Sequence, residues 1–136
     1  MTASRRQVLG ALAALPLTQA RAAAPVTTTT TMKETPRKYG LIGKMCSTPG
    51  QRDALIAILL EGTTAMPGCL AYIIAKDKQD ADAIWITETW DSQDHHKASL
   101  TLPSVQAAIK QARPLIAGFG ERFETEPVGG QGLSNK

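Results

Sequence analysis

The stretch that most constrains the fold is residues 84–100, IWITETWDSQDHHKASL, where a strand pattern runs directly into the start of a helix. Within the strand pattern, large apolar side chains alternate onto both faces, with Trp90 on one face and Trp85 on the other. The alternation stops before Ser92, which is a good N-cap for a helix that carries Asp94 in its first turn. The chain's own helices can cover only one face of this strand, so we expect the other face to need a different cover.

The other elements follow from the same two periodicities, two residues for a strand and 3.6 for a helix. Alternation predicts strands, and apolar three- and four-residue spacing predicts helices, in this order: strand 38–47, helix 51–64, strand 69–76, helix 105–113 and strand 119–125. Ser104 is expected to cap the last helix and Pro114 to stop it. In the last strand, strict alternation places on one face Phe119, Glu121 and Phe123, against Arg122 and Glu124 on the other.

The order strand, helix, strand, strand, helix, strand is the split βαβ arrangement of a ferredoxin-like fold. The sequence therefore predicts an α+β domain with a four-stranded antiparallel sheet and helices on one face. Three of the four strands carry apolar side chains on both parities, which is a larger patch than a soluble monomer normally exposes. We expect a homodimer in which two sheets pack face to face.

The N-terminal residues 1–24 have a basic start, an apolar run and small residues that suit cleavage after Ala22 or after Ala24, the pattern of an export signal. Arg5 and Arg6 resemble the twin-arginine type, which predicts a periplasmic or secreted protein. The apolar run has about half the length that a membrane anchor needs, so no stable anchor is expected. A threonine-rich linker, 25–37, a domain, 38–127, and a disordered tail, 128–136, complete the chain.

Charge and cysteine content limit the partners of the exported chain. Removal of residues 1–24 lowers the count of lysine and arginine from 15 to 12, equal to the 12 aspartates and glutamates. No basic cluster remains that could neutralise a run of phosphates, so nucleic acid is not an expected partner. Cys46 and Cys69 lie in or beside apolar strand patterns, which favours free cysteines packed as small apolar residues over a disulfide.

Several motifs give the sequence a family resemblance over residues 39–127. They are the Pro-Gly turn at 49–50, the stretch PGCLAY at 67–72, and Glu-Thr-Trp at 88–90 followed by a helix with alanine and histidine. With these marks the chain resembles the antibiotic biosynthesis monooxygenase domain, whose members are dimeric α/β barrels and include quinol monooxygenases. The resemblance implies oxygen insertion into an electron-rich phenol or quinol, with O2 and without a metal or flavin cofactor.

This chemistry requires an apolar pocket, a base that helps to form the substrate anion, and a polar group that holds the oxyanion. As the resemblance implies it, His96 is the candidate base, and Glu88 orients the substrate hydroxyl or the histidine. The aromatic residues expected to line the pocket are Trp90, Tyr72, Trp85 and Phe123. Many family members carry a histidine nine residues after the motif tryptophan, where this chain has Ser99, so His96 either takes over that role or is unrelated to it.

Other interpretations of the same residues stay open. Trp85 and Tyr72 also suit ordinary core or interface packing, and Glu88 suits a structural hydrogen bond or ion pair. His95 is expected to face solvent, and no metal site is expected, because adjacent helical residues point roughly 100° apart. A dimer that binds a small apolar ligand without catalysis is the alternative function. Haem degradation fits less well, because those relatives use an asparagine on a core strand and the only asparagine here is Asn135.

Overall fold

The computed structural model describes residues 37–133. The predicted export signal, nearly all of the linker and the end of the tail lie outside these residues. In chain order the elements are β1 (Tyr39–Ser47), α1 (Arg52–Gly62), β2 (Cys69–Lys76), β3 (Ala83–Trp90), α2 (Gln93–Ser99), α3 (Pro103–Ala112), a short 3-10 helix η1 (Arg113–Leu115) and β4 (Ile116–Thr125).

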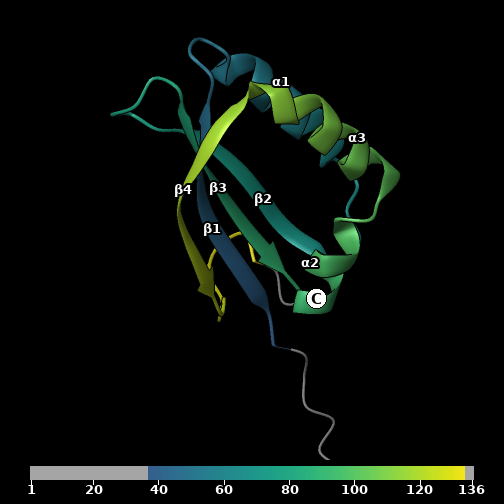
Figure 1. The fold of residues 1–136 in the computed structure, drawn as a ribbon. Helices are drawn as coiled ribbons and strands as arrows, with labels where there is room; N and C mark the ends of the chain where they lie inside the picture. Colours follow the sequence, from purple (N-terminus) through teal and green to yellow (C-terminus); the bar gives the residue numbers. More distant parts are fainter. Residues whose placement is uncertain (1–36, 134–136) are drawn as a thin grey trace, which may run out of the picture. The chain divides into compact units, whose positions relative to one another are not determined.

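The four strands form one antiparallel sheet in the order β2-β3-β1-β4. Helices α1 and α3 lie together over one face of this sheet, and α2 follows the end of β3 (Figure 1). This arrangement confirms the predicted ferredoxin-like α+β fold with helices on one face. β2 and β4 are the two edge strands.

The core lies between that face and the helices. Leu55 and Leu59 of α1 meet Ile84 and Ile86 of β3, and Ala112 of α3 closes the cluster. The isoleucines point to the helices because they share one parity of β3. All five side chains are buried, so removal of this apolar surface from water is the main source of the domain's stability.

Helix ends test the predicted capping residues. The backbone N–H of His95 donates to Oγ of Ser92 at 3.2 Å, which confirms Ser92 as the N-cap of α2. Ser104 is not the cap of α3, because that helix begins at Pro103 with Leu102 as its N-cap. Proline suits the first helical position, where its missing N–H would have no partner, so the helix starts earlier than the serine suggested.

The edge strand β4 contains a β-bulge. Gly43 of β1 pairs with Arg122, and Met45 pairs with Phe119. The step between these two pairs therefore covers three residues on β4 and two on β1. The extra residue shifts the alternation, and both Phe119 and Arg122 therefore face the helices, while Phe123 faces away. The prediction that Phe119 and Arg122 lie on opposite faces is wrong for this reason.

The two cysteines are free. Cys46 pairs with Ala83 and Cys69 with Trp90, near opposite ends of β3. Seven strand residues span about 23 Å, whereas a disulfide needs Cα atoms within about 7 Å, so the two cannot bridge within one chain. Within residues 37–133, no helix has the length and apolar character needed to cross a membrane.

Candidate functional site

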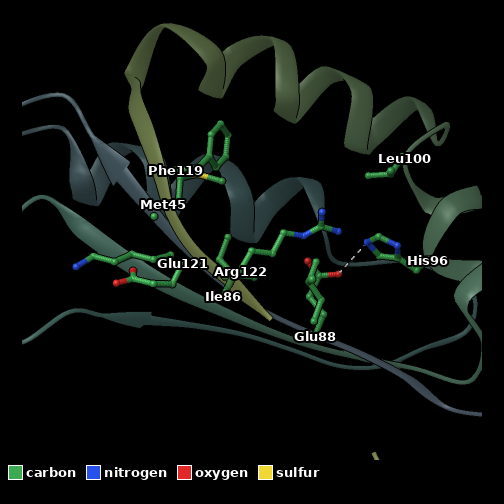
Figure 2. Close-up of a pocket in the computed structure, with 12 residues that line it drawn as sticks. Met45, Ile86, Glu88, His96, Leu100, Phe119, Glu121 and Arg122 are labelled. Atoms are coloured by element: carbon green, nitrogen blue, oxygen red, sulfur yellow. Dashed lines mark ion pairs between the residues drawn. The ribbon is translucent and has the colours of Figure 1, made fainter. Parts of the chain in front are cut away.

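A pocket of about 470 Å³ lies on the helix-covered face of the sheet. Strands β1, β3 and β4 and the C-terminal end of α2 contribute its walls (Figure 2). Most of the lining is apolar and comes from Leu41, Met45, Ile86, Leu100 and Phe119. Charge or hydrogen-bonding capacity comes from five further lining residues, Lys44, Glu88, His96, Glu121 and Arg122.

Glu88 and His96 form a pair inside the pocket. Oε2 of Glu88 lies 3.6 Å from Nε2 of His96, and only 13% and 12% of the two side chains is exposed. The same carboxylate oxygen accepts a hydrogen bond from Nε1–H of Trp90 at 2.9 Å. Burial raises the pKa of Glu88, while the bond from Trp90 and the nearby His96 and Arg122 oppose that rise.

Two aromatic rings fix the imidazole of His96 in place. The Tyr39 ring lies 5.1 Å from it between centroids, and the Trp90 ring meets it edge-on at 5.5 Å. Tyr39 is itself held, because its hydroxyl donates to Oε1 of Glu124 at 3.0 Å. The imidazole therefore has one preferred position, with Nε2 beside the Glu88 carboxylate.

The neighbouring His95 faces elsewhere. Its Nδ1 pairs with Oδ1 of Asp91, and about half of its side chain is exposed, in agreement with the prediction that it faces solvent. The His95 ring lies against Gly68, where a Cβ would overlap it and where φ is +81°. Within residues 37–133, no three His, Cys, Asp or Glu side chains gather as metal ligands.

The remaining predicted residues divide between the two faces of the sheet. Trp90 is buried beside Glu88 and His96, and Tyr72 lies opposite Glu88 on β2, packed against the core. Burial raises the pKa of the Tyr72 hydroxyl, with a further contribution from the charge of Glu88. Trp85 and Phe123 belong to the opposite face, and their contact with a substrate stays a prediction.

Trp85 and Phe123 differ in how they are held. Nε1–H of Trp85 donates to Oδ2 of Asp77 at 2.9 Å, and the same oxygen lies 3.1 Å from Nζ of Lys44. Phe123 lies opposite Ile42 and is 54% exposed. Neither side chain lines the pocket that holds His96 and Glu88.

Arg122 is a charged pocket residue that the sequence did not predict. It lines the pocket with Glu88 and His96, although strict alternation separated it from Phe119. Two glycines, Gly118 and Gly120, flank that phenylalanine. Glycine inside a strand often marks a bulge, so this pair was the signal that the alternation would break.

A family model and a solved structure place the chain in the same family. The family model described as antibiotic biosynthesis monooxygenase matches residues 39–111. A candidate antibiotic biosynthesis monooxygenase from Chloroflexus aurantiacus J-10-fl is 67% identical, with a TM-score of 0.70, over 71% of this chain and 99% of that one. No protein among the curated ones matches the chain.

More distant solved structures share the fold. A candidate antibiotic biosynthesis monooxygenase from Caulobacter crescentus CB15 is 19% identical, with a TM-score of 0.63, over 70% of this chain and 93% of that one. A Pseudomonas aeruginosa protein is 17% identical, with a TM-score of 0.61, over 70% of this chain and 98% of that one.

Proposed function

The chain belongs to the antibiotic biosynthesis monooxygenase family, and we propose that it oxidises a small aromatic or quinol substrate with O2 in the pocket that holds His96 and Glu88. The observation that carries this proposal is the buried pair itself: a carboxylate 3.6 Å from an imidazole in a pocket whose lining is mostly apolar. A histidine with such a partner is suited to accept a phenolic proton near neutral pH.

Each residue has a role in this proposal. The imidazole of His96 takes the hydroxyl proton of the substrate, and the Glu88 carboxylate, beside Nε2, stabilises the imidazolium that forms. Trp90 fixes the carboxylate through its indole N–H. Ser99 does not compete for the substrate, because its Oγ donates to the carbonyl oxygen of His96 at 2.7 Å and its side chain is buried.

The stoichiometry of the reaction is simple for a hydroquinone. Reduction of O2 takes four electrons. Insertion of oxygen into a C–H bond supplies two of them, and oxidation of the hydroquinone to the quinone supplies the other two, so a hydroquinone and O2 give a hydroxyquinone and water. One oxygen atom enters the product and the other leaves as water. The protein therefore has to bind the substrate, take its proton and keep bulk water away from the anion, which the apolar lining favours.

Oxygen consumption by the mature protein with a panel of hydroquinones tests the proposal. We expect His96→Ala to lower turnover about a hundredfold, the typical contribution of a positioned base. His95→Ala is the matched control and should leave turnover unchanged, because His95 pairs with Asp91 outside the pocket. Binding of hydroquinones without oxygen consumption would instead support the non-catalytic ligand-binding alternative.

Dimerisation belongs to the same proposal. The sheet face away from the helices exposes 56% of Ile73 and 54% of Phe123, and β1 adds the side chain of Ile42 between β3 and β4. A second copy packed on this face would remove that apolar surface from water. Light scattering should give twice the chain mass at micromolar concentration, and a stable monomer would contradict the idea.

Export is the last part of the proposal. It rests on residues 1–24 of the sequence, with their paired arginines, apolar run and small residues at the expected cleavage site. A protein delivered to the periplasm or secreted would meet its aromatic substrate outside the cytoplasm.

A further inference from the structure

Arg122 occupies a distinctive place in the pocket. It lies on β4 beside the bulge, and the residue opposite it on β1 is Gly43, which presents no side chain. A Cβ at Gly43 would meet nothing within 4 Å, so open space lies across from the arginine. The guanidinium extends toward the end of the pocket that holds Glu88 and His96 (Figure 2).

The present partner of Arg122 leaves it able to bind something else. Among residues 37–133, its ionic partner is Glu124, with one nitrogen to oxygen distance of 3.4 Å. The two side chains are 60% and 56% exposed. A long contact between exposed groups contributes little free energy, so a ligand group can replace it at low cost.

The other nearby cation is already engaged. Lys44 contributes to the pocket wall, but its Nζ lies 3.1 Å from Oδ2 of Asp77. Of the two pocket-lining cations, Arg122 is therefore the one with the longer and more exposed ionic contact. A guanidinium stays protonated at every accessible pH and offers five N–H donors, which suits a fixed oxyanion.

We propose that Arg122 binds the substrate's phenolate oxygen, which carries the negative charge once His96 has taken the proton. This assignment rests on the proposed function of the pocket. The O–H bond of the phenol breaks, the proton goes to the imidazole of His96, and the electron pair stays on the oxygen, where the guanidinium N–H groups donate to it. Arg122 thus supplies a polar group of the kind that the chemistry requires for the anion.

Binding of 4-nitrophenol under anaerobic conditions tests this role without any oxidation. The phenol ionises near neutral pH, and its phenolate has its own absorbance band, so bound phenol and bound phenolate are measured separately. We expect the wild-type protein to prefer the phenolate. Arg122→Gln should weaken phenolate binding about tenfold, the loss of one partly exposed charge-assisted hydrogen bond, and leave binding of the neutral phenol at low pH unchanged.

Two further variants make the result specific. Arg122→Lys keeps the charge and should restore part of the phenolate preference. Lys78→Gln removes an exposed positive charge from the loop between β2 and β3, outside the pocket, and should bind as the wild type does. Equal phenolate binding by Arg122→Gln and wild type, or a wild type that does not bind phenolate, would overturn the assignment. If phenolate preference is lost as expected while hydroquinones consume no oxygen, only the oxidation in the proposed function fails.

Discussion

Replacement of Glu88 by glutamine would separate catalysis from stability at the centre of the pocket. The amide oxygen of glutamine can still accept the hydrogen bond from Trp90, so the side chain should keep its position. The negative charge beside His96 is lost. At a separation near 3.6 Å and an effective dielectric constant of about 20, two unit charges interact by about 4.6 kcal/mol.

Only part of this energy appears in the rate. Some solvent reaches both side chains, and Arg122 and the amide of the new residue rearrange, so we expect a loss of about 2 kcal/mol in stabilisation of the imidazolium. Because 1.36 kcal/mol corresponds to a factor of ten, turnover should fall roughly thirtyfold. The assay is oxygen consumption per folded molecule with the best hydroquinone of the panel.

Although Glu88→Gln should lower turnover, it should not lower the stability of the fold. Burial raises the pKa of Glu88, so the folded state holds this proton more tightly than the unfolded state does. The stabilisation that protonated Glu88 gives the folded state is therefore complete below the unfolded pKa of about 4.3 and is lost as pH rises through the higher folded pKa. Glutamine does not titrate, so above that window the variant should melt at the same temperature as the wild type or a higher one.

Two results would refute this reasoning. Undiminished turnover would show that the carboxylate does not assist the histidine, and His96 alone would remain as the base. A fall of melting temperature at pH 8 would show that the ionised carboxylate stabilises the fold, contrary to the direction of its pKa shift. Melting curves from pH 4 to 8 on both proteins measure the difference directly.

Three further results are expected. Gly68→Ala should destabilise the protein by about 2 kcal/mol or more and lower the melting temperature by several degrees, since alanine is strained at positive φ and its methyl group overlaps His95. Asp77→Asn should lower the melting temperature at pH 7 and reduce the further fall of the melting temperature that the wild type shows as pH is lowered. Hydrogen bonds, first that from the backbone of Gln79, hold the pKa of Asp77 well below its usual range, so its stabilisation is present above the unfolded pKa and lost as pH falls. Replacement of both arginines of the expected export signal by lysines should block delivery to the periplasm, as fractionation of cells would show, and unchanged delivery would exclude the twin-arginine route.

The sequence was sufficient for the fold because its signals were local and mutually consistent. β2 occupies the predicted residues, and Ser92 ends one element and caps the next. The pattern also placed Glu88 and Trp90 on one face and the helix with His96 directly after them. Each of these inferences needs only the period of a strand or a helix and the chemistry of a cap.

The rest of the pocket could not be predicted because it depends on non-local facts. β3 has apolar side chains on both of its faces, and the sequence does not tell which face the helices will cover. It therefore could not show that Trp90 lies under the helices and Trp85 on the opposite face. The bulge in β4 reverses the alternation between Phe119 and Arg122, and strand pairing with β1 is needed to see it. Tyr39 was not expected near His96, because 57 residues separate them in the chain and only the pairing of β1 with β3 brings them together.

The bulge also bears on how the domain avoids aggregation. β4 is ten residues long and lies at an open edge of the sheet, where a row of unpaired backbone groups can recruit a strand from another molecule. A bulge twists such an edge away from a flat template, and Glu121, Arg122 and Glu124 place charges along it. The irregularity that turns Arg122 toward the pocket therefore also makes this edge a poor template for fibril growth.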